Sequence, residues 1–398
     1  MAQASADVLI PLLWERLSPE HWPVRLSQLP EGTALVGGAI RDALLNQLSD
    51  QPDLDFIVPS NAIALAKSLS KQLGGTAVVL DAERDIARPV LNNWTIDLAR
   101  QDGQTIEQDL LRRDYGVNAI ALGLRPWGEL WDPTGGLSDL RDGRLRAVSE
   151  GNLVDDPLRL LRGLRLISEH PLELEAETQQ WIALHRKRLG QAAPERILSE
   201  LQRLVRGPQA DAAIACLKTL DLLHGWAAGE PVPTAVMAQR LNASEAAEAL
   251  PLARLTALVS DEGLSQLRAS RNLRQRCRRL RQWRREVMQC SKALGEQERL
   301  QMHQDLEHDL PALILELPEE QQTAWLQRWR DPADPLFHPC NPVDGTMLQR
   351  ELNLRPGPHL GDVLNHLKLE FAFRRITSKN EAITAARRFL REMGTLCD

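Results

Sequence analysis

The chain has 398 residues, of which 43% are hydrophobic and 26% are charged, with a formal net charge of −6 at pH 7. This length allows two or three domains, and the composition is that of an ordinary globular protein with a sizeable core. The net acidity argues against a generally basic nucleic-acid binder, although it conceals one dense basic segment.

The chain shows no targeting or membrane signal. It lacks the basic start and apolar stretch of a signal peptide and any apolar run of about 18 residues, so we expect a cytoplasmic protein with no membrane partner. Its five cysteines have neither C-x-x-C spacing nor a disulfide pattern. We therefore expect free thiols at Cys216, Cys277, Cys290, Cys340 and Cys397.

The first 150 residues mix strand and helix patterns. Residues 33–37 and 54–58 predict short strands, separated by a segment with apolar residues at helical spacing. Ser60 is placed to cap a helix over residues 61–73, which Gly74 and Gly75 end. Residues 76–80 and 93–99 predict two further strands. Together these patterns predict an α+β N-terminal part built on a small mixed or antiparallel sheet.

The pattern changes at Asp155. Leucine-rich helical periodicity runs from there to about residue 331, with almost no strand alternation. Residues 331–345 are rich in Pro, Asp and Gly and predict a linker or an irregular connection before a final helical segment. The remainder of the chain is therefore predicted to be almost all helical.

Two aspartates lie one residue apart at the second predicted strand, "DLDFIV" (residues 53–58). Residues i and i+2 of a strand share a face, so Asp53 and Asp55 direct both carboxylates to one point, whereas Leu54 and Phe56 point into the core. Mg²⁺ typically takes one or two carboxylates together with water and substrate phosphate. The pair thus suits metal-assisted phosphoryl chemistry. The alternative is a pair of exposed turn acids after Pro52.

A Gly-Gly turn precedes this pair. Gly37 and Gly38 end the first predicted strand and open a helix whose free N–H groups favour phosphate. Arg41 lies on the first turn of that helix, where a cation is unfavourable unless an anion is bound. The spacing matches neither a dinucleotide fingerprint nor a P-loop. The alternative is a structural turn in which Arg41 reaches Asp50 or Asp53.

Three further blocks carry candidate binding residues. "RRDYGVNA" (residues 112–119) pairs two arginines, which suit a polyphosphate, and "DPTGGLSDLRDGRLR" (132–146) is a Gly-containing loop. "DDPLRLLRGLRLI" (155–167) predicts a helix with Pro157 in its first turn. The polar stripe of this helix consists of Asp156, Arg159, Arg162 and Arg165. An Asp and an Arg together can read a base edge, whereas a solvated salt-bridge face is the alternative.

In this order the blocks resemble class II tRNA nucleotidyltransferases, the family of CCA-adding enzymes and bacterial poly(A) polymerases. The matching stretches are GGAIRD with the following D-L-D, RRDYGVNA, DPTGGLSDL, DDPLRLLRGLR and APERILSEL (193–201), with a weaker likeness over 341–361. The resemblance implies a catalytic head over residues 1–150, a helical neck with base recognition over 151–205, a tRNA-binding helical body over 206–330 and a helical tail over 331–398.

The resemblance also implies residue roles. Asp53 and Asp55 would hold the catalytic Mg²⁺ ions that activate the primer 3′-hydroxyl. The incoming nucleotide would be bound by Gly37, Gly38, Arg41, Arg113 and Asn118. Asp156 and Arg159 would hydrogen-bond the base edge, supported by Arg162 and Arg165. The implied partners are the tRNA 3′ end and CTP, with ATP for a complete terminus. Asp97, on the strand 93–99, is either catalytic or a buried strand-end acid.

Departures from the family pattern bear on specificity. The usual Phe-Thr-Ile after R-R-D is Tyr115-Gly116-Val117 here, and Gly116 is expected to loosen a turn near the nucleotide; Asp155 replaces the common Glu. Complete CCA-adding relatives carry a flexible loop between the D-x-D strand and R-R-D, which this chain lacks. In the family the absence of this loop accompanies addition of the two cytidines alone. We therefore expect CC addition; the alternative is that residues 101–103 serve as a minimal loop for full CCA addition.

Residues 268–285 contain nine arginines and no acid. Such a segment repels itself on a helix unless an anionic partner or solvent screens it. A tRNA phosphate backbone is one such partner, and a solvated helix face is the alternative. We expect Trp283 to belong to the core rather than to stack on a base. We also expect that His303 and His308-Asp309 do not form the metal site of a phosphohydrolase domain.

Two other functions compete with tRNA nucleotidyl transfer. A poly(A) polymerase of the same family is disfavoured by the short chain and the lack of a long basic C-terminal extension. A non-catalytic RNA-binding protein of the same fold is disfavoured because both aspartates, Arg113 and Asp156 are intact.

Overall fold

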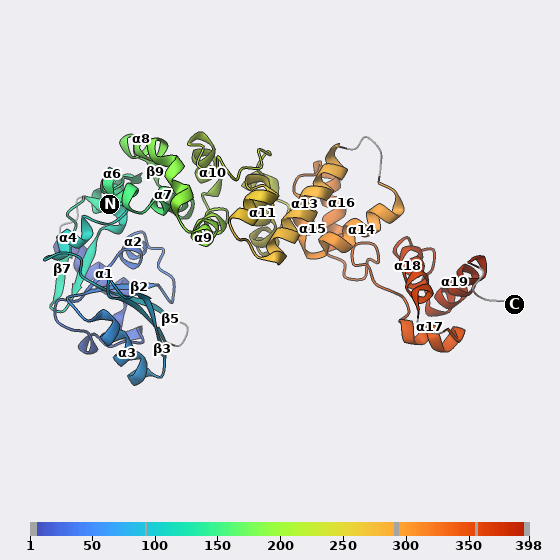
Figure 1. The fold of residues 1–398 in the computed structure, drawn as a ribbon, viewed down its shortest axis with the longest axis horizontal. Helices are drawn as coiled ribbons and strands as arrows, with labels where there is room; N and C mark the ends of the chain where they lie inside the picture. The colour runs from blue at the N-terminus through green and yellow to red at the C-terminus, as the bar shows by residue number, and fades with distance from the viewer. Residues whose placement is uncertain (1–5, 92–93, 290–293, 355–356, 394–398) are drawn as a thin grey trace. The chain divides into compact units, whose positions relative to one another are not determined.

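The structure, a computed structural model, describes residues 6–91, 94–289, 294–354 and 357–393. The chain divides into two compact units, residues 1–200 with 207–222 and residues 201–206 with 223–398 (Figure 1). The first unit contains a seven-stranded sheet, and helices dominate the second. The predicted fold class, an α+β head followed by a mostly helical chain, is confirmed. The finer division into head, neck, body and tail stays a prediction.

The sheet has the strand order β3-β4-β5-β2-β1-β6-β7. Neighbouring strands are antiparallel except β2 and β5, which are parallel. The strands are β1 (Ala34–Val36), β2 (Leu54–Val58), β3 (Thr76–Asp81), β4 (Ile86–Leu91), β5 (Trp94–Arg100), β6 (Ala121–Leu124) and β7 (Trp127–Trp131). The four predicted strands are confirmed, although residue 93 lies outside the described part. Strand β4 escaped prediction because Pro89 disfavours a strand interior.

The helices of the first unit flank this sheet and continue beyond it. Around the sheet lie α1 (Ala6–Leu17), α2 (Gly38–Leu44), α3 (Ala62–Leu73), α4 (Ile106–Leu110) and α5 (Gly136–Asp142). Next come α6 (Glu150–Asp155), α7 (Leu158–Glu169), α8 (Ala176–His185), α9 (Pro194–Leu204) and α10 (Ala210–Thr219), with a short pair of strands, β8 (Arg144–Leu145) and β9 (Glu173–Leu174). The leucines opposite the polar stripe of α7 are buried, as predicted.

The start of α3 differs from the prediction. Asn61, not Ser60, precedes the first helical residue, and it forms no side-chain cap. The Asp85 carboxylate accepts hydrogen bonds from the N–H groups of Ala62 at 3.0 Å and Ile63 at 2.9 Å. The predicted Ser60 cap is therefore wrong, because an acceptor more than twenty residues away satisfies the free N–H groups. Gly74 ends the helix at φ 74°, as predicted.

The described part of the second unit is helical. Its helices are α11 (Ala243–Leu258), α12 (Asp261–Gln266), α13 (Arg271–Gln289), α14 (Glu296–Leu306), α15 (Leu310–Ile314), α16 (Glu319–Trp329), α17 (Gly345–Leu352), α18 (Pro358–Ala372) and α19 (Lys379–Glu392). The segment between α16 and α17 is irregular, as predicted, but Leu336 and Phe337 are buried, so it is a packed connection rather than an exposed linker.

Two further expectations concern the whole chain. Among the residues described, no helix is long and apolar enough to cross a bilayer. Cys216, Cys277 and Cys340 are free thiols, as expected, whereas Cys290 and Cys397 lie outside the described residues.

Candidate active site

The two predicted catalytic aspartates lie at the centre of the sheet. Asp53 is exposed just before β2, and Asp55 is half-buried within it, between Val36 of β1 and Asp97 of β5. Leu54 is buried, as the pleat predicts. The alternative of two turn acids is wrong for Asp55, which is a central strand residue.

Burial raises the pKa of the Asp55 carboxyl to about 6. The Arg113 guanidinium opposes this rise, and the carboxylates of Asp97 and Asp53 add to it. The charged form of Asp55 is therefore under-compensated by the protein alone. A cation bound at this carboxylate would restore the balance.

Gly37 brings the turn after β1 against this carboxylate. Its φ of 80° and ψ of −130° favour glycine. A Cβ placed on Gly37 would lie 3.5 Å from Asp55 Oδ2 and 3.7 Å from Arg113 Nη1. A Cβ on Gly38 would lie 3.6 Å from Arg41 Nη2. The Gly-Gly turn thus gathers Asp55, Arg113 and Arg41 around one backbone segment.

A hydrogen-bonded chain joins three predicted nucleotide-binding residues. Arg41 Nη1 donates to Asn118 Oδ1 at 2.5 Å, and Asn118 Nδ2 donates to Asp114 Oδ1 at 3.2 Å. Arg162 Nε lies 3.3 Å from Asp114 Oδ2 as an ion pair. Arg41 also pairs with Asp42 at 2.9 Å. The alternative that Arg41 reaches Asp50 or Asp53 is therefore wrong.

Asp114 is the centre of this chain and is buried. Burial favours the neutral acid, but the Arg162 guanidinium and hydrogen bonds from Asn118 and the Tyr115 N–H together hold the pKa of Asp114 below its ordinary value. Asp114 therefore stays ionised and fixes Arg162 and Asn118 relative to each other. Sequence reasoning gave Asp114 no role because it saw only the neighbouring arginines.

The predicted base-reading residues lie at the start of α7. Arg159 Nη1 donates to the carbonyl oxygens of Arg112 and Asn152, each at 3.0 Å. The Asp156 carboxylate accepts from the Leu158 N–H at 3.2 Å. Its other oxygen pairs with Arg196 Nη2 of α9 at 3.2 Å. Both side chains are thus anchored by protein groups while still partly exposed.

Arg165 lies apart from these side chains. It is buried and pairs with Glu169 on its own helix and with Glu200 of α9, the latter at 2.6 Å. Both ends of its guanidinium are therefore held by carboxylates, which leaves its predicted support of nucleotide binding indirect at most.

Tyr115 contacts the same helix. Its side chain is fully buried, and its hydroxyl donates to the Arg159 carbonyl oxygen at 2.7 Å. A Cβ on Gly163, one turn further along α7, would lie 2.2 Å from the Tyr115 oxygen. Gly163 therefore makes the room that this hydroxyl needs.

Gly116 is buried and tightly packed. A Cβ on Gly136 of α5 would lie 2.1 Å from the Gly116 carbonyl oxygen, so the two glycines permit a close backbone approach. The loosening expected of Gly116 is therefore wrong for this turn.

A short turn joins the sheet to the R-R-D block. β5 ends at Arg100 and α4 begins at Ile106. The Asp102 N–H donates to Asp109 Oδ1 at 2.9 Å, and the Gln104 N–H donates to Gln108 Oε1 at 2.7 Å. Residues 101–105, which join β5 to α4, are thus held on α4 through two of their N–H groups.

Sequence reasoning missed three residues around this site. Arg88 of β4 binds both oxygens of Asp97. Asn152 of α6 donates to the carbonyl oxygens of Leu111 and Arg113, which attaches the R-R-D block to that helix. Arg196 lies in the APERILSEL block, which was recognised without assigning any residue a role. Only that block offered a signal in the sequence; the other two contacts depend on tertiary register.

The residues at Asp53 and Asp55 fit a divalent cation. Among the described residues, no group of three or more His, Cys, Asp or Glu side chains could hold a metal ion. Two carboxylates suffice for Mg²⁺ when water and substrate phosphate supply its other ligands. His308 is exposed, and Asp309 pairs with Arg276 of α13.

The arginine-rich segment forms most of α13 in the second unit. Acidic side chains from neighbouring segments pair with many of its arginines, including Arg276 with Asp309 at 2.7 Å, Arg284 with Glu316 at 2.7 Å, and Arg281 with Asp261. Trp283 is buried and donates to Asp305 at 3.1 Å, so its expected place in the core is confirmed. The repulsion predicted from the sequence is thus largely relieved within the protein.

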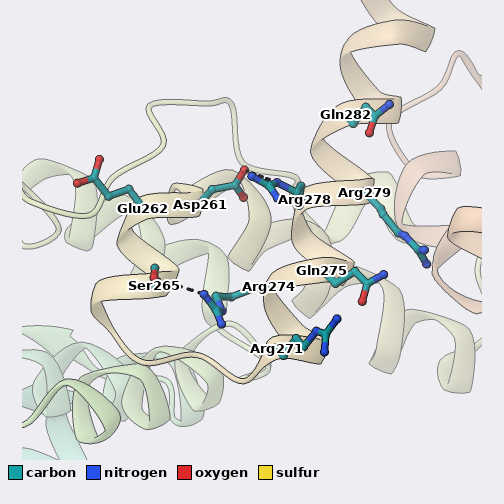
Figure 2. Close-up of a pocket in the computed structure, with 9 residues that line it drawn as sticks. All are labelled: Asp261, Glu262, Ser265, Arg271, Arg274, Gln275, Arg278, Arg279 and Gln282. Carbon is teal, nitrogen blue, oxygen red and sulfur yellow. Dashed lines mark hydrogen bonds and ion pairs between the residues drawn. The ribbon is translucent and has the colours of Figure 1, made fainter.

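Four arginines of the segment, Arg271, Arg274, Arg278 and Arg279, line an open pocket beside α12 (Figure 2). Arg271, Arg274 and Arg278 occupy positions i, i+3 and i+7 of α13 and are exposed. Arg274 Nη1 donates weakly to Ser265 Oγ at 3.4 Å, and Arg278 lies 3.8 Å from Asp261. This face presents three exposed guanidinium groups to an anionic partner.

The comparisons with known proteins agree with this geometry. The model of the poly A polymerase head domain matches residues 33–146, and that of the probable RNA and SrmB-binding site of polymerase A matches residues 171–227. The first match covers the sheet and its neighbouring helices, and the second covers a mostly helical segment. The chain is thus similar to class II tRNA nucleotidyltransferases and poly(A) polymerases.

Individual relatives carry different specificities in their names. The CC-adding tRNA nucleotidyltransferase of Synechocystis sp. is 29% identical over 92% of this chain and 95% of its own length. The A-adding tRNA nucleotidyltransferase of Deinococcus radiodurans is 41% identical over 50% of this chain and 45% of its own. The fold matches the Thermotoga maritima CCA-adding enzyme complexed with tRNA, at a TM-score of 0.70 and 21% identity over 96% of this chain and 98% of that one.

Proposed function

We propose that this chain adds the two cytidines of the tRNA 3′ terminus, using CTP and releasing pyrophosphate. The observation that carries the proposal is the short turn at residues 101–105, which joins β5 directly to α4. The relative that matches almost the whole chain is named a CC-adding enzyme, which supports the same specificity. The alternative of a minimal loop at residues 101–103 is disfavoured because the hydrogen bonds to Asp109 and Gln108 hold this segment on α4.

In the proposed reaction Asp53 and Asp55 would hold Mg²⁺, which would supply polarisation of the α-phosphate and a lower pKa of the attacking hydroxyl. Asp55, within the sheet between β1 and β5, would be the fixed ligand, and Asp53, exposed just before β2, the second one.

The charged residues around Gly37 are suited to the triphosphate. Arg113 lies beside Asp55, and Arg41 and Arg162 are held by Asn118 and Asp114. Guanidinium groups held in fixed positions stabilise developing phosphate charge without reorganising. Arg113 is anchored by Asp109 at 3.3 Å, which leaves its Nη1 directed toward the Gly37 turn.

Base choice is assigned to Asp156 and Arg159. A carboxylate accepts from an exocyclic amine such as that of cytosine, and a guanidinium donates to ring and carbonyl acceptors. Because Asp156 is held by the Leu158 N–H and Arg196, and Arg159 by the Arg112 and Asn152 carbonyl oxygens, the hydrogen-bond pattern is preset before the nucleotide binds.

The test supplies tRNA ending at the discriminator base with labelled CTP, ATP or UTP and Mg²⁺. We expect two CMP residues to be added, and we expect Asp53→Ala or Asp55→Ala to abolish turnover while tRNA affinity stays nearly unchanged. Long A tails on unrelated RNA would instead identify a poly(A) polymerase. A double aspartate variant that stays active would contradict the metal assignment.

A further inference from the structure

Three charged side chains form a row across neighbouring strands of the sheet. Asp97 of β5 is in register with Asp55 of β2. The pairs Ala87–Leu98 and Val90–Thr95 set the register between β4 and β5, which places Arg88 across from Asp97. Cross-strand partners lie on the same face of a sheet. Arg88, Asp97 and Asp55 therefore line one face, in this order.

The Arg88 guanidinium occupies the whole carboxylate of Asp97. Arg88 Nε donates to Asp97 Oδ1 at 2.6 Å, and Arg88 Nη2 donates to Asp97 Oδ2 at 2.7 Å. Such a fork is the most rigid geometry available to an Arg–carboxylate pair. Both oxygens that could ligate a cation are thus engaged by protein.

We propose that Arg88 is a positioning residue that keeps Asp97 from ligating the divalent cation, so that the protein ligands of the cation are Asp53 and Asp55 alone. This inference rests on the proposed function, since it needs a cation at those two aspartates. Asp97 is the third carboxylate on this face and lies beside Asp55, close enough to raise the pKa of Asp55.

Such an arrangement keeps coordination positions of the cation open, so that substrate can replace bound water. Each additional carboxylate tightens a divalent cation and removes one of its water positions. A site with two carboxylates leaves positions open for the triphosphate and the primer hydroxyl, whereas a third ligand would close one of them. Arg88 also keeps a positive charge near Asp53 and Asp55, both of which act on the Arg88 guanidinium.

The test measures Mn²⁺ binding to the full chain without nucleotide, by electron paramagnetic resonance for affinity and water-proton relaxation for the number of bound waters. We expect Arg88→Gln to bind Mn²⁺ about three- to tenfold tighter and to lose about one bound water, because Asp97 becomes a ligand. Adding Asp97→Asn to Arg88→Gln is expected to remove both effects. Arg84→Gln, an exposed arginine before β4, is the matched control and should change neither.

Three results would overturn the proposal. Unchanged Mn²⁺ affinity in Arg88→Gln would show that the fork does not restrain Asp97. Tighter Mn²⁺ binding without a lost water would show that Arg88 acts only through its positive charge and does not restrain Asp97. A loss of binding in the isosteric Asp97→Asn as large as that in Asp55→Asn would make Asp97 a ligand already. By contrast, Mn²⁺ binding that survives Asp53→Asn with Asp55→Asn would refute the proposed metal site itself.

Discussion

Asp55, the proposed metal ligand within the sheet, lies in an unfavourable environment for its charge. Its pKa in the folded protein is raised to about 6, chiefly by burial. Between about pH 4 and pH 6, the folded chain therefore binds more protons at Asp55 than the unfolded chain does. The free energy of unfolding falls as the pH rises through this range. Above pH 6 or so the full penalty is present in the metal-free protein.

Asp55→Asn should therefore stabilise the metal-free protein. We expect the free energy of unfolding at pH 8, measured by urea titration in EDTA, to rise by about 1–2 kcal/mol, less than the full pKa shift implies because Asp55 is partly exposed. The difference should shrink as the pH falls through 6 toward 4. Asp53→Asn, at an exposed position, is the control. Equal stability of the two variants at pH 8 would contradict the account.

Gly163 of α7 packs directly against Tyr115. A Cβ there would lie 2.2 Å from the oxygen and 2.6 Å from Cζ of Tyr115. We expect Gly163→Ala to destabilise the protein by about 1–3 kcal/mol through overpacking, measured by urea unfolding. Gly151→Ala, on α6 with its nearest neighbour at 3.8 Å, should be neutral or mildly stabilising.

Adding Tyr115→Phe to Gly163→Ala should recover only part of the loss, since the ring carbon still clashes. Full recovery of the free energy of unfolding would mean that the Tyr115 hydroxyl alone requires a glycine at residue 163. Gly163→Ala with unchanged stability would show that α7 can shift away from Tyr115.

Among the elements, α13 carries arginines that differ in how closely acidic side chains hold them. Arg276, Arg281 and Arg284 are engaged by Asp309, Asp261 and Glu316. Arg271, Arg274 and Arg278 face the open pocket (Figure 2). Ion pairing to the protein therefore limits which arginines can neutralise phosphates.

Changing Arg271, Arg274 and Arg278 together to Gln should weaken tRNA binding and reduce the slope of log affinity against log salt by about 2–3, since each neutralised phosphate contributes about 0.7–0.9. The control changes Arg84, Arg141 and Arg350, three arginines outside this segment, to Gln. Fluorescence anisotropy at several salt concentrations measures both. If the salt slopes of the two triple variants are equal, Arg271, Arg274 and Arg278 face solvent and do not contact the tRNA.

The elements also show which local patterns were sufficient. The strand pattern predicted β1, β2, β3 and β5, and it placed Asp55 inside β2 with Leu54 and Phe56 buried; Asp53 lies just before the strand. Strand β4 was hidden by Pro89, and with it Arg88 and its fork to Asp97. The cap of α3 by Asp85 and the ion pairs of α13 also depend on partners far along the chain. Local sequence fixes periodicity and turns, but it cannot supply partners that only tertiary packing brings close.

At the scale of the whole molecule, the residues proposed for catalysis differ from those proposed for specificity. Arg41, Asn118 and Arg162 are joined through Asp114 by buried or half-buried contacts in the first unit, and Asp55 lies in a central strand of the same unit. The catalytic chemistry proposed for them does not depend on which nucleotide is added. Specificity is assigned instead to Asp156 and Arg159, and termination to the turn at residues 101–105.

Whether the enzyme adds the terminal adenosine is the most direct test of these assignments. The measurement offers tRNA that already ends in CC, with labelled ATP and Mg²⁺, beside tRNA ending at the discriminator base with labelled CTP. The account predicts CMP incorporation on the second substrate and no AMP on the first. Efficient AMP incorporation onto the CC end would contradict it, and would mean that residues 101–105 do not limit the enzyme to two cytidines.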